Sequence, residues 1–466
     1  MKLILRQWMK LAPGYLPFAD AGSANLPMSR LARLSLFQVS VGLCTVLIVG
    51  TLNRVMIVEL HLAAWIVALM LALPVVFAPF RALIGFRSDK HQSALGWRRF
   101  PYIWKGQMVM FCGLSIMPFA LIILSGDSTG PAWAGPVSAA IAFLVVGIGL
   151  HTVQTAGLAL VTDLTPPEKQ PQAVAFLAVM LLLGMFFGSL IYGAILSPFH
   201  QVKLIMAVQG TALVCMLLTT IAIWKQEARG RELFGLYPEA QNLTEAWRAL
   251  KRTGPWVRQL SATALGGAGF AMQDVLLEAY GGQIFGLSVA STTLLTSLLA
   301  GGGIAGFILA ARRLAAGGDP HRITGFGAVI GGFAFCGITL AAPAESALML
   351  AFCTILIGFG AGLFAHATLT ACMQAAPPGQ AGLALGIWGA VQATAAGIAI
   401  GIGGAMRDVV THLSVAGQFG EALASPLTGY AAVYMIEVVL LFATAIAVGP
   451  LVRTYSVGGA LPSPQP

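Results

Sequence analysis

Long apolar runs separated by short polar connections extend over almost the whole chain. Each run is continuous over about 20 residues, which is the length that an α-helix needs to cross the hydrocarbon core of a bilayer. Transmembrane β-strands would instead alternate apolar and polar residues over about ten positions. The pattern therefore predicts an all-α polytopic membrane protein with about twelve transmembrane helices, at residues 33–56, 62–84, 103–125, 134–160, 172–196, 203–224, 258–283, 288–311, 323–343, 346–372, 381–405 and 428–451.

One long polar stretch, residues 225–257, divides these spans into two sets of six. It is rich in charged side chains, and we expect it to be a linker between two bundles. The predicted organisation is an N-terminal interfacial segment (1–32), an N-terminal six-helix bundle (33–224), the central linker (225–257), a C-terminal six-helix bundle (258–451) and a tail (452–466).

Two internal matches indicate that the halves are related. Thr165-Pro166-Pro167 after the fourth span corresponds to Ala376-Pro377-Pro378 after the tenth, 211 residues later. Residues 52–59 at the end of the first span resemble 272–278 in the seventh, at an offset of 220 residues. A duplicated arrangement of six and six helices predicts the major facilitator fold, in which two six-helix bundles face each other.

Composition and charge agree with a lipid environment. Apolar residues make up 58% of the chain, charged residues make up 9%, and the mean hydropathy is +0.84. Too few polar groups are present to cover a water-exposed surface. Lys and Arg cluster near the N-terminus, at 81–105, in the linker and at 311–322, which are alternate connections. Because positive residues near span ends are retained on the cytoplasmic side, we expect both termini and the linker there. This bias also accounts for the net charge of +9, so no nucleic-acid partner is expected.

Charged residues at membrane depth are the first candidates for function, because each is costly unless it is paired or faces a polar space. Asp274 and Glu278 are four residues apart and share a helix face, next to Gln273. Arg54 and Glu59 occupy the corresponding stretch of the first half. One hypothesis is that Arg54 and Asp274 form an ion pair that holds the halves closed on the periplasmic side. The alternative is that each pairs locally or with water. A proton-coupling role for Asp274 or Glu278 is a further hypothesis.

Two histidines lie at lipid depth in equivalent spans. His151 precedes Pro166 by 15 residues, and His366 precedes Pro377 by 11, so the difference is about one helical turn. The two side chains are therefore expected to project from similar faces, with Gln154 near the first. A neutral imidazole nitrogen is a good axial ligand for the magnesium of a chlorin, so His151 and His366 are candidate ligands. The alternative is that each makes a hydrogen bond between helices.

Several long stretches resemble the PucC/LhaA family, the bacteriochlorophyll delivery family of the major facilitator superfamily. The motifs that carry the resemblance are Leu34–Gly42, Gly50–Leu60, Phe77–Asp89, Ser93–Arg99 and Met272–Gly282, and the likeness covers essentially the whole chain. The segments 17–20 and 25–29 are more similar to the LhaA branch, which is associated with the LH1 antenna, than to the branch associated with LH2.

The resemblance implies a light-harvesting complex assembly factor, serving LH1 rather than LH2. Its expected cofactor is non-covalent bacteriochlorophyll or a precursor, without a free metal ion. The implied partners are the antenna α and β polypeptides, the reaction centre–LH1 complex, bacteriochlorophyll synthase, the Sec/YidC machinery and the lipid bilayer. The implied location is the bacterial inner, intracytoplasmic photosynthetic membrane. The candidate pigment contacts are His151, Gln154, His366, Gln273, Asp274 and Glu278.

Two other functions remain open at this point. Most major facilitator proteins transport solutes, so a proton-coupled small-solute transporter is the first alternative. A scaffold that binds antenna polypeptides without pigment is the second. No soluble-enzyme motif such as G-x-S-x-G, H-E-x-x-H or a P-loop occurs in the chain, and enzymatic activity is not expected.

Overall fold

The computed structural model describes residues 26–76, 81, 84, 88, 97–125, 131, 133–166, 169–227, 248, 251–252, 254–375 and 381–458. Within these ranges the chain is helical apart from short connections, and no strand occurs. Helices satisfy their own backbone hydrogen bonds, which is what a chain in lipid requires. Most of the predicted N-terminal segment, linker and tail lie outside the described residues, so the predicted domain limits stay predictions.

The first half begins with an irregular span. It consists of α2 (Met28–Leu34), α3 (Leu36–Thr45) and two π-helical segments, η3 (Val46–Leu52) and η4 (Val55–Glu59). The spans that follow are α4 (Ala64–Val76), α6 (Phe100–Leu124), α7 (Ala134–Leu164), α8 (Gln170–Ile195) and α9 (Gln201–Ile223).

The second half also begins with an irregular span. Here α11 (Trp256–Ala271) leads into a 3₁₀ segment, η6 (Met272–Val275), and then α12 (Leu277–Phe285), with a bend of 42° between the two parts. The remaining elements are α13 (Val289–Ala315), α14 (Pro320–Ala341), α15 (Ala347–Ala375), α16 (Ala381–Val415), the short 3₁₀ helix η7 (Glu421–Leu423) and α17 (Pro426–Gly458).

Helix lengths match the predicted spans closely, with α16 as the main exception. Ten helices among the described residues are long and apolar enough to cross a membrane, and the bent pair α11–α12 makes an eleventh. The shorter apolar helix α4 occupies the second position of the first half. The prediction ended the eleventh span at residue 405, but α16 continues to Val415. Arg407, which a hydropathy window penalises, lies in this extension and bonds to the side chains of Asp408 and Gln283.

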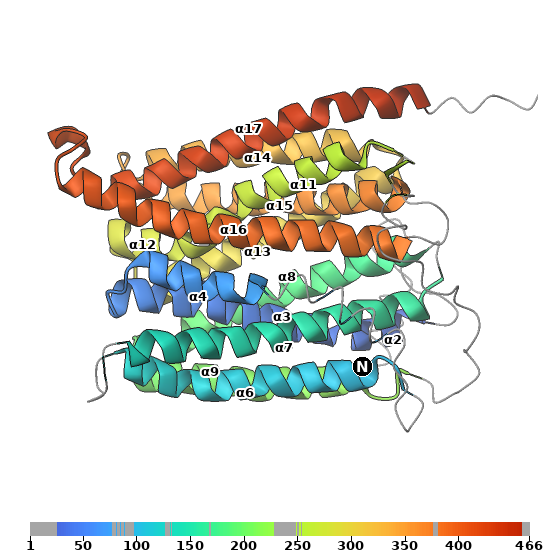
Figure 1. The fold of residues 1–466 in the computed structure, drawn as a ribbon, viewed down its shortest axis with the longest axis horizontal. Helices are drawn as coiled ribbons and strands as arrows, with labels where there is room; N and C mark the ends of the chain where they lie inside the picture. The colour runs from blue at the N-terminus through green and yellow to red at the C-terminus, as the bar shows by residue number, and fades with distance from the viewer. Residues whose placement is uncertain are drawn as a thin grey trace, which may run out of the picture.

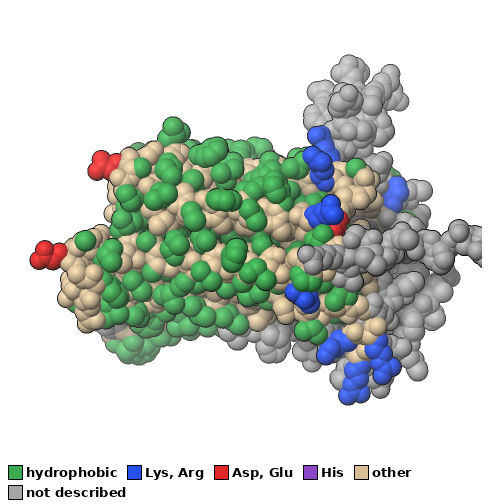
Figure 2. Space-filling model, turned by 90° about the horizontal axis from the view of Figure 1, so that it is seen from above, with side chains coloured by type: hydrophobic (Ala, Val, Ile, Leu, Met, Phe, Trp, Pro, Cys, Tyr) green, Lys and Arg blue, Asp and Glu red, His purple; other side chains and the backbone are tan. Residues whose placement is uncertain are grey.

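The helices run roughly along one direction, with those of the second half beside those of the first (Figure 1). Helix α2 begins and α17 ends at the same end of the bundle. Figure 2 shows Lys and Arg side chains gathered at this end with an acidic side chain among them, further acidic side chains at the other end, and a belt of apolar side chains between the two ends. We call the Lys- and Arg-rich end the basic end. The belt is the surface that a bilayer would cover.

The two halves touch along two pairs of helices, α8 with α13 and α4 with α16. The hydroxyls of Ser189 and Ser297 are 2.6 Å apart across the first pair. Across the second, the backbone N–H of Trp65 donates to the carboxylate of Asp408 at 2.7 Å. These residues lie in the parts of their helices that are farther from the basic end. The halves are therefore held together at the end opposite to it.

Candidate functional site

The seventh span breaks at η6, and residues of both halves form hydrogen bonds with the backbone at this break. A 3₁₀ segment inside a longer helix leaves backbone groups without their regular partners. The carboxylate of Glu437 on α17 accepts a hydrogen bond from the backbone N–H of Gln273 at 2.6 Å. The side-chain amide of Asn53, in the first half, donates to the carbonyl oxygens of Val275 and Asp274 at 2.8 and 3.2 Å. The break is thus a contact point between the halves.

Glu278 follows the break and faces the first half. Its side chain is buried, with 2% exposed, and accepts hydrogen bonds from the hydroxyls of Thr296 and Thr293 on α13. A Cβ atom added at Gly50, on η3, would lie 2.5 Å from a carboxylate oxygen of Glu278. A side chain at position 50 would displace this carboxylate from its present place. Glu278 therefore lies where the two halves meet.

Arg54 does not pair with Asp274. Its guanidinium forms an ion pair with Glu59 and donates to the carbonyl oxygen of Leu287, in the second half, at 3.2 Å. The carboxylate of Asp274 accepts a hydrogen bond from the neighbouring side chain of Gln273 instead. The reason is the π-helical geometry of η4, because a π-helix bonds residues five apart and brings Arg54 and Glu59 together. The predicted ion pair is wrong for this structure, although Arg54 does contact the other half.

A double-mutant cycle tests this pairing. We expect Arg54→Gln and Glu59→Gln to be coupled by about 1 kcal/mol in the free energy of unfolding, because each removes the same ion pair. Arg54→Gln and Asp274→Asn should be additive within about 0.5 kcal/mol. Denaturant unfolding of the purified protein in detergent measures both cycles. Coupling in the second cycle and additivity in the first would contradict the observed pairing.

His151 lies in a polar cluster that joins α7 to the second span. α7 packs closely on α4, since a Cβ at Gly147 would overlap the Pro74 ring. The imidazole of His151 is partly buried and lies beside Pro74 and the guanidinium of Arg81. Arg81 donates to the Gln154 side chain and to the Thr155 hydroxyl, both at 3.1 Å. Arg81 was not predicted as a site residue, because it falls in the 81–105 stretch that was expected to be a cytoplasmic connection. The available signal was its position inside the apolar window 62–84.

His366 lies on the equivalent helix of the second half, displaced by about one turn from the position of His151 in the repeat. It lies on α15, the fourth span of its half, and its ring centroid is 5.0 Å from that of Phe307 on α13, the second span. The surroundings of the two histidines differ, because His151 has polar neighbours whereas His366 is only 6% exposed and lies against an aromatic ring. In both, the Nδ1 atom is buried and makes no hydrogen bond that meets the usual distance and angle limits with any described residue.

These two imidazoles fit the chemistry of a ligand to magnesium. A neutral imidazole with an unpaired ring nitrogen has a lone pair or an N–H that can bind a ligand once the side chains covering it move aside. The partly buried His151 is the more accessible, and the donors of Arg81 and Gln154 beside it suit carbonyl groups at the edge of a ligand. His366 is the less accessible of the two, because only 6% of it is exposed.

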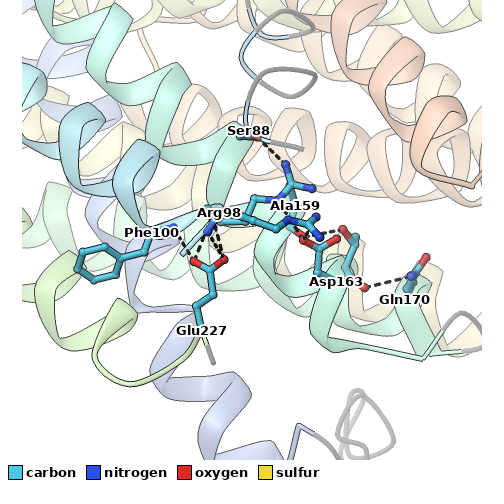
Figure 3. Close-up of polar contacts among 9 residues, drawn as sticks. Ser88, Arg98, Phe100, Ala159, Asp163, Gln170 and Glu227 are labelled. Atoms are coloured by element: carbon cyan, nitrogen blue, oxygen red, sulfur yellow. Dashed lines mark hydrogen bonds and ion pairs between the residues drawn. The ribbon is translucent and has the colours of Figure 1, made fainter. Parts of the chain in front are cut away.

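A second charged network lies at the basic end and was not found from the sequence (Figure 3). The carboxylate of Glu227 accepts from the backbone N–H groups of Arg98, Arg99 and Phe100 at 2.6–3.1 Å, at the start of α6. The guanidinium of Arg99 lies 3.0 Å from the carboxylate of Asp163 on α7. Negative charge at a helix N-terminus is favourable. The network therefore ties the beginning of the linker to the first half, away from the histidines.

The comparisons with known proteins agree with the fold and name a family. The sequence profile described as PUCC protein matches residues 51–456. The chain is 53% identical over 417 residues to Protein PucC of Rhodovulum sulfidophilum, which covers 88% of this chain and 91% of that protein. It is 49% identical over 457 residues to an uncharacterized protein in the puhA-bchM intergenic region of Rhodobacter capsulatus, covering 97% and 95%.

Among solved structures, the fold is similar to that of a bacterial homologue of the human lysosomal transporter Spinster in an inward-facing, unoccupied conformation. The TM-score is 0.65, the identity is 15%, and the match covers 93% of this chain and 98% of the other. At this identity the likeness shows the fold alone, and it confirms the predicted major facilitator fold. The LhaA branch stays a prediction, because the reported relatives do not test it.

Proposed function

This chain belongs to the PucC protein family, and on that premise we propose that it is a non-enzymatic assembly factor that binds bacteriochlorophyll, or a precursor, and delivers it to newly made light-harvesting α and β polypeptides. One observation carries the proposal. Two imidazoles on equivalent membrane-spanning helices, His151 and His366, each have a buried ring nitrogen without a hydrogen-bond partner among the described residues. Such groups suit reversible ligation of a magnesium chlorin.

The chemistry of the cargo fits a site at helix surfaces within the bilayer. A large apolar pigment with a long tail gains by staying in lipid, and a few polar groups are enough to orient its ring. His151 supplies the axial ligand in this proposal, and Arg81 and Gln154 supply donors to ring carbonyls. Weak ligation is sufficient, because the cargo must be released.

The proposed orientation places the basic end in the cytoplasm, following the positive-inside rule. The halves touch at the opposite end, so we propose that cargo is exchanged nearer the cytoplasmic leaflet. The proposed membrane is the photosynthetic inner membrane, and the proposed client is LH1 and the reaction centre–LH1 complex rather than LH2. The proposed neighbours are bacteriochlorophyll synthase and the Sec/YidC machinery.

An absorption spectrum of the protein purified gently from pigment-producing cells tests this function. We expect near-infrared pigment to co-purify with the wild-type chain. His151→Ala should retain about tenfold less pigment per chain, which corresponds to a loss of about 1.4 kcal/mol of binding free energy. The matched control is His412→Ala, because His412 is exposed near the end of α16 and should not matter. Equal pigment in both variants, or a colourless and monodisperse wild-type protein, would contradict the proposal.

A second candidate function is proton-coupled transport of a small solute. Three carboxyl side chains near the break of the seventh span favour it: Asp274, Glu278 and Glu437, of which the last two are 2% and 0% exposed. Carboxyl groups in transmembrane helices are frequent in proton relays. Uptake of a solute into liposomes under a pH gradient, by protein that carries no pigment, would favour this candidate. A colourless protein that retains antenna polypeptides would instead indicate a pigment-free scaffold.

A further inference from the structure

A shallow crevice of about 210 Å³ lies on the surface where α2 meets the basic end of α9. It is lined by Arg33, Thr220, Ile221 and Trp224. The side chains of Ile221 and Trp224 are exposed, at 48% and 60%. The crevice therefore combines one cation with an apolar wall, at the depth where the membrane-spanning part of α9 ends.

Arg33 has more hydrogen-bond donors than partners. A guanidinium carries five N–H groups. That of Arg33 makes one hydrogen bond among the described residues, from Nη2 to the carbonyl oxygen of Trp224 at 3.0 Å, and its Nε is buried without a partner there, so Nη1 and Nη2 are the donors that face outward. The neighbouring Arg30, in contrast, donates to the side chain and to the carbonyl of Gln226 at 2.8 and 2.6 Å. Among the described residues no carboxylate pairs with Arg33, and a cation at the edge of the lipid belt in this situation is stabilised by an external anion.

The apolar wall continues along α9 into the belt. Leu213, Leu217, Ile221 and Trp224 are all exposed, at 57%, 63%, 48% and 60%, and follow one another at spacings of four, four and three residues. This spacing places them on one face of the helix. The face leads from the middle of the span to the crevice. A long hydrocarbon chain lying along it would end beside Arg33.

We propose that this crevice binds one anionic phospholipid. Its phosphate lies against the Arg33 guanidinium, its glycerol region lies against the Trp224 indole, and one acyl chain follows the exposed face of α9. Tryptophan prefers this level of the bilayer, and arginine matches phosphate with paired donors. Because Arg33 and Arg30 already bond to the backbone of Trp224 and Gln226, a lipid here would strengthen the contact between α2 and the start of the linker.

Native mass spectrometry of the full-length protein in detergent tests the site with phosphatidylglycerol. We expect one phosphatidylglycerol to be retained per chain at concentrations where phosphatidylcholine is not. Arg33→Gln should weaken this binding about tenfold, which is about 1.4 kcal/mol. Arg33→Lys should weaken it less, because it keeps the charge and loses the paired geometry. The matched control is Arg322→Gln, since Arg322 is a cytoplasm-side arginine in the proposed orientation and is 71% exposed. Equal losses in Arg33→Gln and Arg322→Gln would show general charge attraction and overturn the site.

A second variant and a second readout distinguish loss of the lipid site from misfolding of the Arg33→Gln variant. Thr220→Trp fills the crevice without changing a charge and should weaken phosphatidylglycerol binding as Arg33→Gln does. Phosphatidylglycerol with brominated acyl chains should quench tryptophan fluorescence in the wild-type protein, and Trp224→Phe should remove that part of the quenching. If inorganic phosphate displaces the lipid, the site recognises free phosphate. If no quenching depends on Trp224, another part of the chain fills the crevice. Either result overturns the lipid site and leaves the pigment proposal untouched.

Discussion

Replacement of Gly358 by alanine is expected to destabilise the protein by about 2 kcal/mol or more, as a lower thermal midpoint of unfolding in detergent. The reason is the contact between α13 and α15. A Cβ atom at Gly358 would overlap the backbone carbonyl of Leu299 on α13, and a backbone atom has no rotamer by which to move away. The two helices must separate along a contact that Gly302, Gly306 and Gly362 also keep close. Small residues are what permits such close packing in membranes.

The matched control for this prediction is Gly332→Ala. Gly332 lies on α14, and a Cβ atom there would meet nothing within 4 Å. Alanine in a helix interior is more favourable than glycine by about 0.5–1 kcal/mol, so this variant should be neutral or more stable. Similar losses in both variants would mean that close approach at Gly358 is not what holds α13 and α15 together.

Replacement of Glu437 by alanine is expected to cost about 1–3 kcal/mol of stability. Glu437 is fully buried on α17, and its carboxylate accepts the backbone N–H of Gln273 at the break of the seventh span. Alanine would leave that N–H buried without an acceptor, inside a helix that the 3₁₀ segment has already interrupted. Thermal unfolding of the purified protein measures the loss.

Glu437→Gln separates the hydrogen bond from other effects of this site. Glutamine has nearly the same shape and keeps an oxygen that accepts from Gln273, so it should recover more than half of the stability lost in the alanine variant. If glutamine and alanine are equally destabilising, the hydrogen bond to the break is not what Glu437 contributes.

The spans could be predicted from the sequence because lipid requires long apolar helices, and hydropathy reports them directly. The same method placed the end of the eleventh span too early. It counts Arg407 as a cost, whereas in the structure Arg407 is 8% exposed, bonds to Asp408 and Gln283, and lies over the Tyr430 ring. A hydropathy window averages residues along one helix, so it takes no account of partners on other helices.

The repeat comparison located the region where the halves meet but not its geometry. It aligned 52–59 with 272–278, and both stretches are irregular in the structure, as π-helical and 3₁₀ segments. The pairing of Arg54 depends on that irregularity, because an ordinary α-helix would not favour a partner five residues away. The backbone contacts of Asn53 and Glu437 with the break were likewise not predictable from residue spacing.

The candidate site was partly predictable from the sequence. Depth and repeat spacing identified His151 and His366, and the structure places both against the second span of their half. Arg81 was missed because it lies near a predicted span end, where a charge usually meets water. Glu227 and Asp163 were missed because their partners, Arg98 and Arg99, are more than 60 residues away in the chain.

Pigment transfer between membranes measures the proposed delivery most directly. Pigment-loaded protein in lipid nanodiscs is mixed with liposomes that contain antenna α and β polypeptides, and the near-infrared absorption of the antenna is followed over time. The account predicts that the wild-type chain supplies pigment faster than protein-free nanodiscs with the same pigment content, and that His151→Ala loses most of this advantage while His412→Ala keeps it. Equal transfer from nanodiscs with and without the protein would contradict the account.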